Sequence, residues 1–415
     1  MGHARVGIIH YSAPPVIGGV ERVIAEHVRL LVQLGYQTAV ITGRGDPNAL
    51  PKETEFIKIA ELDSQHPLIL EISSNLERGK VPEEFFEALE GLKEKLVPVL
   101  AGFDKLIVHN IFTKHFNLPL TAALVNLLDG EKIKGIIAWC HDLTWTSPSS
   151  GSKVHPGYPW DLIRSYHPKV QYVVVSTSRQ SELAGLFGCP TDRIEVIYNG
   201  VDPTEVLGLS LDSHALISRL EMLDSDINLL MPVRVTKAKN IEYALEVTAA
   251  IKNASVSPKL VLTGPPDPHD SMSMEYYQSL LELRRNLGVD NEMRFVFESG
   301  PNPDQGYLIS SRVVGDLLRI SDVMFMPSHR EGFGMPVLEA GLAGIPVVST
   351  GVPAAVEIAA DRILIFQKDQ PAEQTAQNII NLVNSNPISR LRRQVLQNYT
   401  WKAIFKRQIE PLLNR

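Results

Sequence analysis

The sequence has little cysteine, few aromatic residues and no basic excess, and each shortage excludes a class of protein. Two cysteines in 415 residues, Cys140 and Cys189, are too few for a disulfide framework or a four-thiolate zinc site. Forty basic against 47 acidic side chains leave a net charge of -7, which argues against a general nucleic-acid-binding protein. With 7% aromatic and 44% hydrophobic residues, the composition is that of a globular protein rather than a disordered or fibrous one.

The sequence also lacks an apolar run near the ~20 residues that a membrane-spanning helix requires. No charged-then-apolar segment typical of a signal peptide precedes the first strand-like run, Val6–His10. We therefore expect a cytoplasmic protein, and the few cysteines suit a reducing compartment. Peripheral contact with a membrane surface stays open, because the net charge does not describe local patches.

Apolar, strand-like runs alternate with helical patterns along the chain. In the first half the predicted strands are Val6–His10, Thr38–Thr42, Lys105–His109, Gly135–Trp139, Tyr172–Ser176 and Ile194–Ile197. In the second half they are Leu229–Val233, Leu260–Thr263, Arg294–Phe297, Asp322–Met326, Ile345–Ser349 and Ile363–Phe366. Runs that are apolar throughout indicate strands buried on both faces, which is typical of a parallel sheet covered by helices.

Helical periodicity separates these runs, and the chain length favours two domains. The predicted helices include Val20–Gly35, Ile241–Ile251, Met274–Leu287 and Pro336–Ala343. The segment 202–226 contains no strong strand. The sequence therefore predicts an α/β protein with two doubly wound parallel-sheet domains, residues 1–205 and residues 206–398, and with ligands at the carboxyl ends of the strands.

The sharpest local pattern runs from Ser328 to Glu339 and reads SHREGFGMPVLE. The glycines Gly332 and Gly334 let the backbone approach a ligand, and the N-terminus of the helix that follows offers N–H groups to an anion. Glu331 and Glu339 can then point into one pocket and accept hydrogen bonds from sugar hydroxyls. The alternative is that Glu331 is a solvated loop charge and Glu339 a partner of the helix dipole.

This segment resembles the signature of glycosyltransferase family 4, in which two glutamates separated by seven residues lie in the pattern Glu-Gly-Phe-Gly-x-Pro-x-x-Glu-Ala. Further segments resemble the family in the same order along nearly the whole chain: Gly18-Gly19, His141-Asp142, the run from Val196 to Asp202, Arg234 and Lys239. The resemblance implies the GT-B fold, with two facing Rossmann-like domains and an interdomain cleft. It places the acceptor on the first domain, the nucleotide-sugar donor on the second, and a C-terminal helix at about 399–415 back on the first.

Four residues are the predicted catalytic residues: Arg234, Lys239, Glu331 and His141. Arg234 and Lys239 follow the first strand of the second domain, where two fixed cations can neutralise a leaving diphosphate. Lys237 is a further candidate, and a solvated basic loop is the alternative interpretation. By resemblance, Glu331 holds the donor sugar and His141 positions that sugar or its acceptor. His141 is otherwise an ordinary strand-end residue.

The resemblance further implies donor-binding roles for Gly18, Gly19, Gly264, Gly332, Phe333, Gly334 and Glu339. In the family, a loop like Gly18-Gly19 lies over the donor phosphates and the acceptor, whereas its alternative interpretation is a flexible turn. This loop lacks the Gly-x-Gly-x-x-Gly pattern of dinucleotide-binding proteins, which counts against a dehydrogenase. Gly264 resembles a glycine turn at a nucleotide pocket. Two departures from the family are Pro232-Val233 before Arg234 and the segment from Gly351 to Glu357, which has no clean Gly-Gly-x-Pro-Glu pattern.

These patterns predict a retaining glycosyltransferase that moves a sugar from a UDP-, GDP- or ADP-sugar to a hydroxyl acceptor by front-face displacement. The expected partners are that nucleotide sugar and a carbohydrate or other hydroxyl acceptor, with no nucleic acid. Because the GT-B fold generally needs no catalytic metal, neither a metal nor another cofactor is expected. The alternatives are a nucleotide-sugar epimerase, a glycan phosphorylase of the same fold, or a non-catalytic nucleotide-sugar-binding protein.

Overall fold

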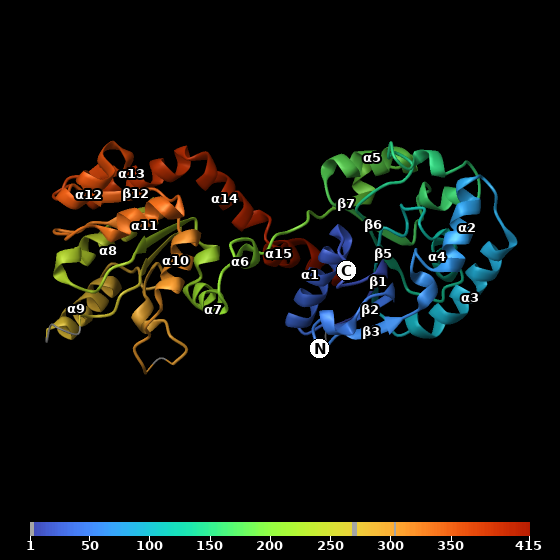
Figure 1. The fold of residues 1–415 in the computed structure, drawn as a ribbon, viewed down its shortest axis with the longest axis horizontal. Helices are drawn as coiled ribbons and strands as arrows, with labels where there is room; N and C mark the ends of the chain where they lie inside the picture. Colours follow the sequence, from blue (N-terminus) through green and yellow to red (C-terminus); the bar gives the residue numbers. More distant parts are fainter. Residues whose placement is uncertain (1–3, 268–271, 303) are drawn as a thin grey trace. The chain divides into compact units, whose positions relative to one another are not determined.

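The computed structural model describes residues 4–267, 272–302 and 304–415, and the chain divides into two compact units. Unit 1 comprises Met1–Gly200 and Trp401–Arg415, and unit 2 comprises Val201–Thr400. Each unit contains one fully parallel sheet with helices on both faces (Figure 1). The predicted α/β class with two Rossmann-like, parallel-sheet domains, as in the GT-B fold, is confirmed.

Unit 1 has a seven-stranded sheet with the order β3-β2-β1-β4-β5-β6-β7. Its strands are β1 Arg5–Ser12, β2 Gln37–Arg44, β3 Glu55–Lys58, β4 Lys105–His109, β5 Ile136–Cys140, β6 Val170–Val174 and β7 Ile194–Val196. The direction of winding reverses between β1 and β4, so the topological switch point lies there. The edge strand β3 was not predicted, because its four residues, Glu-Phe-Ile-Lys, form no continuous apolar run.

Side chains of β1 alternate between two apolar layers of unit 1. Ile9 and Tyr11 pack on the face covered by α3 (Glu83–Leu100) and α4 (Leu118–Asp129). Val6 and Ile8 pack on the opposite face, which α1 (Gly19–Gln33) and the C-terminal segment cover. Further helices of the unit are α2 (Pro67–Glu77) and α5 (Thr177–Phe187). Because both faces are covered, the strands are apolar throughout, as the sequence indicates.

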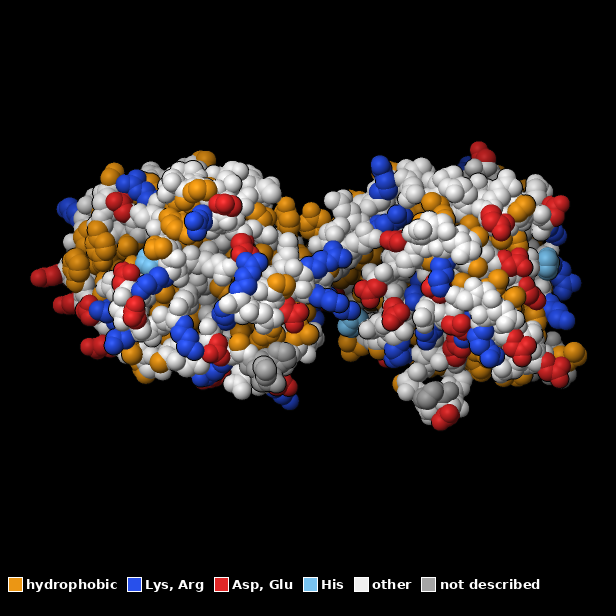
Figure 2. All heavy atoms as spheres, turned by 180° about the vertical axis from the view of Figure 1, so that it is seen from behind, with side chains coloured by type: hydrophobic (Ala, Val, Ile, Leu, Met, Phe, Trp, Pro, Cys, Tyr) orange, Lys and Arg blue, Asp and Glu red, His pale blue; other side chains and the backbone are white. Residues whose placement is uncertain are grey.

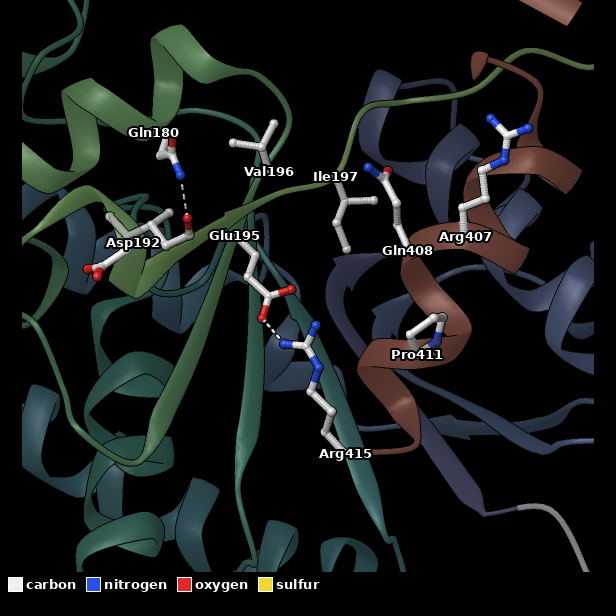
Figure 3. A pocket seen from close by; sticks show the side chains of 10 residues that line it. Gln180, Asp192, Glu195, Val196, Ile197, Arg407, Gln408, Pro411 and Arg415 are labelled. Atoms are coloured by element: carbon white, nitrogen blue, oxygen red, sulfur yellow. Dashed lines mark hydrogen bonds and ion pairs between the residues drawn. The ribbon is translucent and has the colours of Figure 1, made fainter. Parts of the chain in front are cut away.

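The last fifteen residues of the chain complete unit 1. They form α15 (Trp401–Ile404), a π-helical turn (Phe405–Ile409) and α16 (Glu410–Leu413), and their apolar side chains lie in the same layer as those of α1. Arg415 forms an ion pair with Glu195 of the edge strand β7. Between this segment and β7 lies a cavity of about 330 Å³ (Figure 3). None of its lining residues is among the predicted site residues.

Unit 2 has a six-stranded sheet with the order β10-β9-β8-β11-β12-β13. Its strands are β8 Ile227–Met231, β9 Pro258–Leu262, β10 Met293–Phe295, β11 Val323–Met326, β12 Val347–Thr350 and β13 Leu364–Phe366. Counted within the unit, this is the 3-2-1-4-5-6 order of the Rossmann fold. Its switch point lies between β8 and β11.

Two helical layers cover the sheet of unit 2. One face packs against α8 (Ile241–Asn253), α9 (Ser273–Asn286) and α13 (Ala372–Ser385). The other packs against α7 (Leu211–Leu220), α10 (Ser311–Ile320), α11 (Met335–Ala343) and α12 (Pro353–Ala359). The short helix α6 (Pro203–Val206) precedes α7, and α14 (Pro387–Asn398) leads out of the unit. The segment 202–226 was predicted to contain no strong strand. In the structure it contains the helices α6 and α7.

Basic and acidic side chains are interspersed on the face shown in Figure 2. That face shows no extended field of a single sign, which agrees with the small net charge of -7. Within the described part of the chain, no helix has both the length and the apolar character needed to cross a bilayer.

Candidate functional site

The switch point of unit 2 brings most of the predicted donor-side residues together. Arg234 and Lys239 follow β8, and the loop with Glu331 follows the neighbouring strand β11. They share a cavity of about 390 Å³, lined by Pro232, Val233, Arg234, Thr236, Lys239, Glu331, Phe333, Gly334, Met335 and Pro336. In open α/β sheets, ligands bind at the carboxyl ends of the strands at such a point.

Lys239 and Glu331 form an ion pair in this cavity. Lys239 Nζ donates to Glu331 Oε1 at 2.7 Å, and the two side chains are only 20% and 7% exposed. A backbone hydrogen bond of 2.9 Å from His329 N–H to the Ala238 carbonyl oxygen joins the two loops. Burial limits screening by solvent, so the pair is held in one geometry and presents a cation and a carboxylate side by side.

Ser328 was not predicted as a site residue, although it orients Glu331. Its Oγ donates to the same Glu331 oxygen, Oε1, at 2.6 Å, and Ser328 is fully buried. Thr350 Oγ1 of β12 in turn donates to the Ser328 carbonyl oxygen at 2.5 Å. The Ser-x-x-Glu spacing is the signal in the sequence, because a hydroxyl three residues before a carboxylate in a tight loop is within its reach.

Arg234 is the more exposed cation of the cavity. Its side chain is 58% exposed, and Nη1 lies 3.8 Å from Asp267 Oδ1. Gly264 lies behind it rather than in the cavity lining. A Cβ at Gly264 would come within 2.3 Å of the Val233 carbonyl oxygen, and the Gly264 N–H donates to that oxygen at 3.0 Å. Gly264 therefore allows the loops after β8 and β9 to touch, which fixes the backbone that carries Arg234.

The glycine-containing loop leads directly into α11. Gly334 is its N-cap residue, with φ +84, a left-handed conformation that favours glycine. A Cβ at Gly332 would meet no atom within 4 Å, so the backbone there is open to a ligand. The Phe333 side chain is 61% exposed at the cavity rim. Glu339 lies farther along α11, outside the lining, and its carboxylate has no partner among the described residues.

In unit 1, His141 lies at the carboxyl end of β5, next to the switch point. His141 is 9% exposed, and its Nε2 lies 3.0 Å from Nδ1 of His109, which ends β4. Their rings stack at an interplanar angle of 18°. Burial, with smaller contributions from the nearby His27 and His10, lowers the pKa of His141 to about 3. His141 is therefore neutral at physiological pH and suits hydrogen bonding rather than proton transfer.

Three more histidines surround His141, and none of them was predicted. His10 of β1, His27 of α1 and His109 are buried, and burial is the main cause that lowers the pKa of each. Asn110 supports His141 from the loop after β4, because its Oδ1 accepts the backbone N–H of His141 at 2.8 Å. The polar strand ends were visible in the sequence, but only the strand order shows that β1, β4 and β5 are neighbours.

The predicted Gly18-Gly19 loop lies at the start of α1. Gly18 is the N-cap residue, and a Cβ there would come within 2.0 Å of Glu21 Oε2. Glu21, also not predicted, accepts a hydrogen bond of 2.5 Å from Ser12 Oγ and lies 4.0 Å from His10 Nε2. Gly19 has open space around it. Glu21 thus links this loop to the histidines at the switch point of unit 1.

Two family models match the chain. The model described as Glycosyltransferase Family 4 matches residues 17–205, and the model described as Glycosyl transferases group 1 matches residues 218–400. The chain belongs to the family 4, group 1 glycosyltransferases. The matched ranges include every predicted site residue of the chain.

Similar proteins include an uncharacterized glycosyltransferase of Methanocaldococcus jannaschii, 27% identical over 59% of this chain and 60% of that protein. A D-inositol 3-phosphate glycosyltransferase of Saccharomonospora viridis is 27% identical over 55% of this chain and 52% of that protein. The matched region thus spans between about half and 60% of these two relatives. The mannosylglucosylglycerate synthase of Petrotoga mobilis is 24% identical over 84% of this chain and 83% of that protein.

Similar solved structures include a glycosyltransferase from Rickettsia africae, with a TM-score of 0.37, 19% identity and 98% and 97% of the two chains covered. Another is Anabaena HepE in complex with UDP-glucose, with a TM-score of 0.37, 16% identity and full coverage of both chains. Among the described residues of the chain, no three His, Cys, Asp or Glu side chains are arranged to hold a metal ion. The expected lack of a metal and of other cofactors stays a prediction.

Proposed function

We propose that this glycosyltransferase transfers a sugar from a nucleotide sugar to an acceptor hydroxyl and retains the anomeric configuration. The observation that carries this proposal is the Lys239–Glu331 pair beside Arg234 in the cavity at the switch point of unit 2. Two cations match the charge of a diphosphate, and a fixed carboxylate matches the hydroxyls of a sugar. In this proposal residues 206–398 bind the donor and residues 1–205 bind the acceptor.

In this proposal each charged residue on the donor side has one role. Arg234 and Lys239 neutralise the leaving diphosphate, and the N-terminal N–H groups of α11 add to this charge stabilisation. Glu331 accepts hydrogen bonds from the donor sugar, and Glu339 accepts them from the ribose. The open backbone around Gly332 and Gly334 allows the donor to approach closely.

The reaction is a front-face displacement. The bond between the anomeric carbon and the diphosphate oxygen breaks, and the acceptor oxygen bonds to that carbon on the same face. The acceptor proton moves to the departing diphosphate oxygen, so no protein base is required. His141 hydrogen-bonds the donor sugar or the acceptor, in agreement with a pKa of about 3 that makes it a poor base at neutral pH.

The relatives support a small, hydroxyl-bearing acceptor. One is named for transfer to D-inositol 3-phosphate and another for the synthesis of mannosylglucosylglycerate. Each name contains a small polar unit, inositol phosphate in the first and glycerate in the second. We infer an acceptor of similar size, bound at the switch point of unit 1 near His141.

The test begins with thermal unfolding in the presence of UDP-, GDP- and ADP-sugars, because a bound ligand raises Tm by mass action. The donor that binds is then incubated with candidate acceptors, and the released nucleoside diphosphate and the product anomer are measured. We expect acceptor-dependent release and a product with the anomeric configuration of the donor. An inverted product would contradict retention.

Other outcomes of the same assay identify the alternatives. Conversion of the nucleotide sugar without an acceptor would show an epimerase. A requirement for inorganic phosphate would show a phosphorylase. Donor binding without any hydrolysis or transfer would show a non-catalytic nucleotide-sugar-binding protein.

A further inference from the structure

Lys114 of unit 1 is a half-buried cation that has no role in the proposed reaction described so far. It lies in the loop between β4 and α4, and its Nζ is 4.8 Å from the centroid of the Phe116 ring. Among the described residues, the ammonium group has no hydrogen bond and no carboxylate within ion-pair distance. A partly desolvated charge without a counter-ion is costly, so this position favours an incoming anion.

The other charged groups near Lys114 leave it as the available cation. Arg179, at the start of α5, pairs with Glu182 and lies 3.8 Å from Asp142. Lys153 pairs with Glu77 at 3.0 Å. Burial is the main cause of the lowered pKa of Lys114, Asp142 opposes this effect, and Arg179 and Lys153 add to it. Of the three cations, Lys114 alone lacks a carboxylate partner in the described part of the chain.

The loop of Lys114 is tied to His141. The Lys114 backbone N–H donates to the Asn110 carbonyl oxygen at 2.9 Å. The Asn110 side chain accepts the backbone N–H groups of His141 and Asp142 at 2.8 and 3.2 Å. Asn110 therefore fixes the backbone of Lys114 relative to that of His141, at the carboxyl ends of the neighbouring strands β4 and β5.

We propose that Lys114 binds an anionic group of the acceptor, a carboxylate or a phosphate, while an acceptor hydroxyl lies toward His141. This inference rests on the proposed function and names the acceptor class: a small molecule that carries both a hydroxyl and an oxyanion. The ammonium group lies over an aromatic ring and is only half-buried, which suits a charge-assisted hydrogen bond to a ligand. A neutral sugar would leave this cation unpaired, so we expect a lower kcat/KM for a neutral acceptor than for an anionic one.

The test compares acceptors that differ by the anionic group. Glycerate is paired with glycerol, and glucose 6-phosphate with glucose, so that one pair reports on a carboxylate and the other on a phosphate. With the donor found by the thermal screen, we expect kcat/KM for one anionic member to exceed that of its neutral partner by about 10- to 100-fold, the effect of one charged hydrogen bond.

Lys114→Gln should remove this preference by raising KM for the anionic acceptor much more than KM for its neutral partner. Lys134→Gln is the matched control, because Lys134 is exposed and precedes β5 at the amino end of the sheet. Equal use of both members of each pair by the wild type would overturn the inference. So would an equal loss with anionic and neutral acceptors in Lys114→Gln, since this would indicate a structural role.

A binding measurement separates this inference from the proposed function. Glycerate and glucose 6-phosphate are titrated calorimetrically into the wild type and Lys114→Gln. If no donor is turned over, the proposed function fails, but anion binding that Lys114→Gln loses would still support the anion site. Equal binding by the two proteins, or no binding to either, would overturn it.

Discussion

At the scale of the residue, the Lys239–Glu331 pair fixes a cation in the cavity of unit 2, where we propose that the diphosphate binds. Because both side chains are largely buried, the ammonium group keeps its position without ordering cost when the donor binds. Arg234 lines the same cavity, and its side chain is more exposed than that of Lys239.

Arg234→Ala and Lys239→Ala should each lower kcat by about 100-fold or more, the effect of losing one charge-stabilising contact. Steady-state kinetics with the identified donor measure this. Lys237→Ala is the matched control, since Lys237 lies in the same turn but outside the cavity lining. Near wild-type rates in both site variants would contradict the diphosphate assignment.

Ser328 offers a second test at this scale. Ser328→Ala removes one of two hydrogen bonds to Glu331 Oε1 and leaves the ion pair with Lys239. We expect kcat/KM for the donor sugar to fall about 10-fold, the effect of one hydrogen bond to a charged group. Affinity for the free nucleoside diphosphate should not change, because Ser328 does not contact the two cations. A loss of that affinity would indicate a general disturbance of the loop.

At the scale of the element, close approach of the loops after β8 and β9 shapes the cavity of unit 2. Gly264→Ala would place a methyl group 2.3 Å from the Val233 carbonyl oxygen and force the loops after β8 and β9 apart. We expect unit 2 to lose about 1–3 kcal/mol of unfolding free energy, as is typical of overpacking. Turnover should also fall, because the backbone of Arg234 moves.

Gly315→Ala in α10 is the matched control for Gly264→Ala. A Cβ at Gly315 meets no atom within 4 Å, and alanine is the better helix former by about 0.5–1 kcal/mol. Its unfolding free energy should therefore stay equal or rise, as measured by denaturant unfolding. If both variants behave alike, the close contact of the two loops is not what requires glycine at position 264.

The buried histidines of unit 1 predict a stability that depends on pH. In the folded unit the pKa of His27 and of His141 is about 3, against 6.5 for an ordinary histidine. Between these values the unfolded chain binds protons that the folded unit does not. This contribution is therefore complete above about pH 6.5 and is lost as the pH falls, by ~1.4 kcal/mol per pH unit for each histidine.

His27→Leu tests this dependence, since neither ring nitrogen of His27 has a hydrogen-bond partner in the described structure. When the pH falls from about 7 to about 5.5, the variant should lose less unfolding free energy than the wild type. The difference should be about the contribution of one histidine over this pH range. Denaturant unfolding at the two pH values measures it. Parallel losses in both proteins would contradict the role of His27.

The predicted and observed bounds of the strands show how well local sequence patterns locate the ends of these elements. Lys105–His109 was predicted with its observed bounds. The predicted strand Tyr172–Ser176 instead ends at Val174, because Ser176 leaves the sheet to cap α5, where its Oγ accepts the N–H of Arg179. The predicted Leu229–Val233 ends at Met231, since Pro232 has no N–H for the ladder. The carboxyl end of a strand therefore depends on the hydrogen bonds that the residues of the following loop make.

At the scale of the whole molecule, the chain leaves unit 1 at Gly200 and returns to it at Trp401. Gly200 fits this crossing because a Cβ there would lie 2.6 Å from the Trp401 backbone nitrogen. The returning segment buries Trp401, Phe405 and Leu412 in the apolar layer that α1 also covers. The stability of unit 1 therefore depends on residues that follow unit 2 in the sequence.

Deletion of residues 401–415 should destabilise unit 1 and leave unit 2 folded, because an apolar face of unit 1 loses its cover. Limited proteolysis should cleave unit 1 first. Arg415→Ala is the control, since it removes only an exposed ion pair, whose effect is about 0–1 kcal/mol. Equal protease resistance of the deletion variant and the full chain would show that the segment is dispensable.

The sequence by itself determined the alternation of strands and helices, the parallel α/β class and the family. These properties are local, because periodicity, apolar runs and motif spacing are read within short segments. The signature around Glu331 and the cations Arg234 and Lys239 could be chosen as site residues on that basis.

Only the tertiary structure decided which of these segments meet. Lys239 and Glu331 are 92 residues apart, and His109 and His141 are 32 apart. Each pair is in contact because its two strands are neighbours at a switch point, and strand order is not encoded in any single strand. Packing also places Gly264 against the backbone next to Arg234 and leaves Lys114 without a carboxylate partner among the described residues.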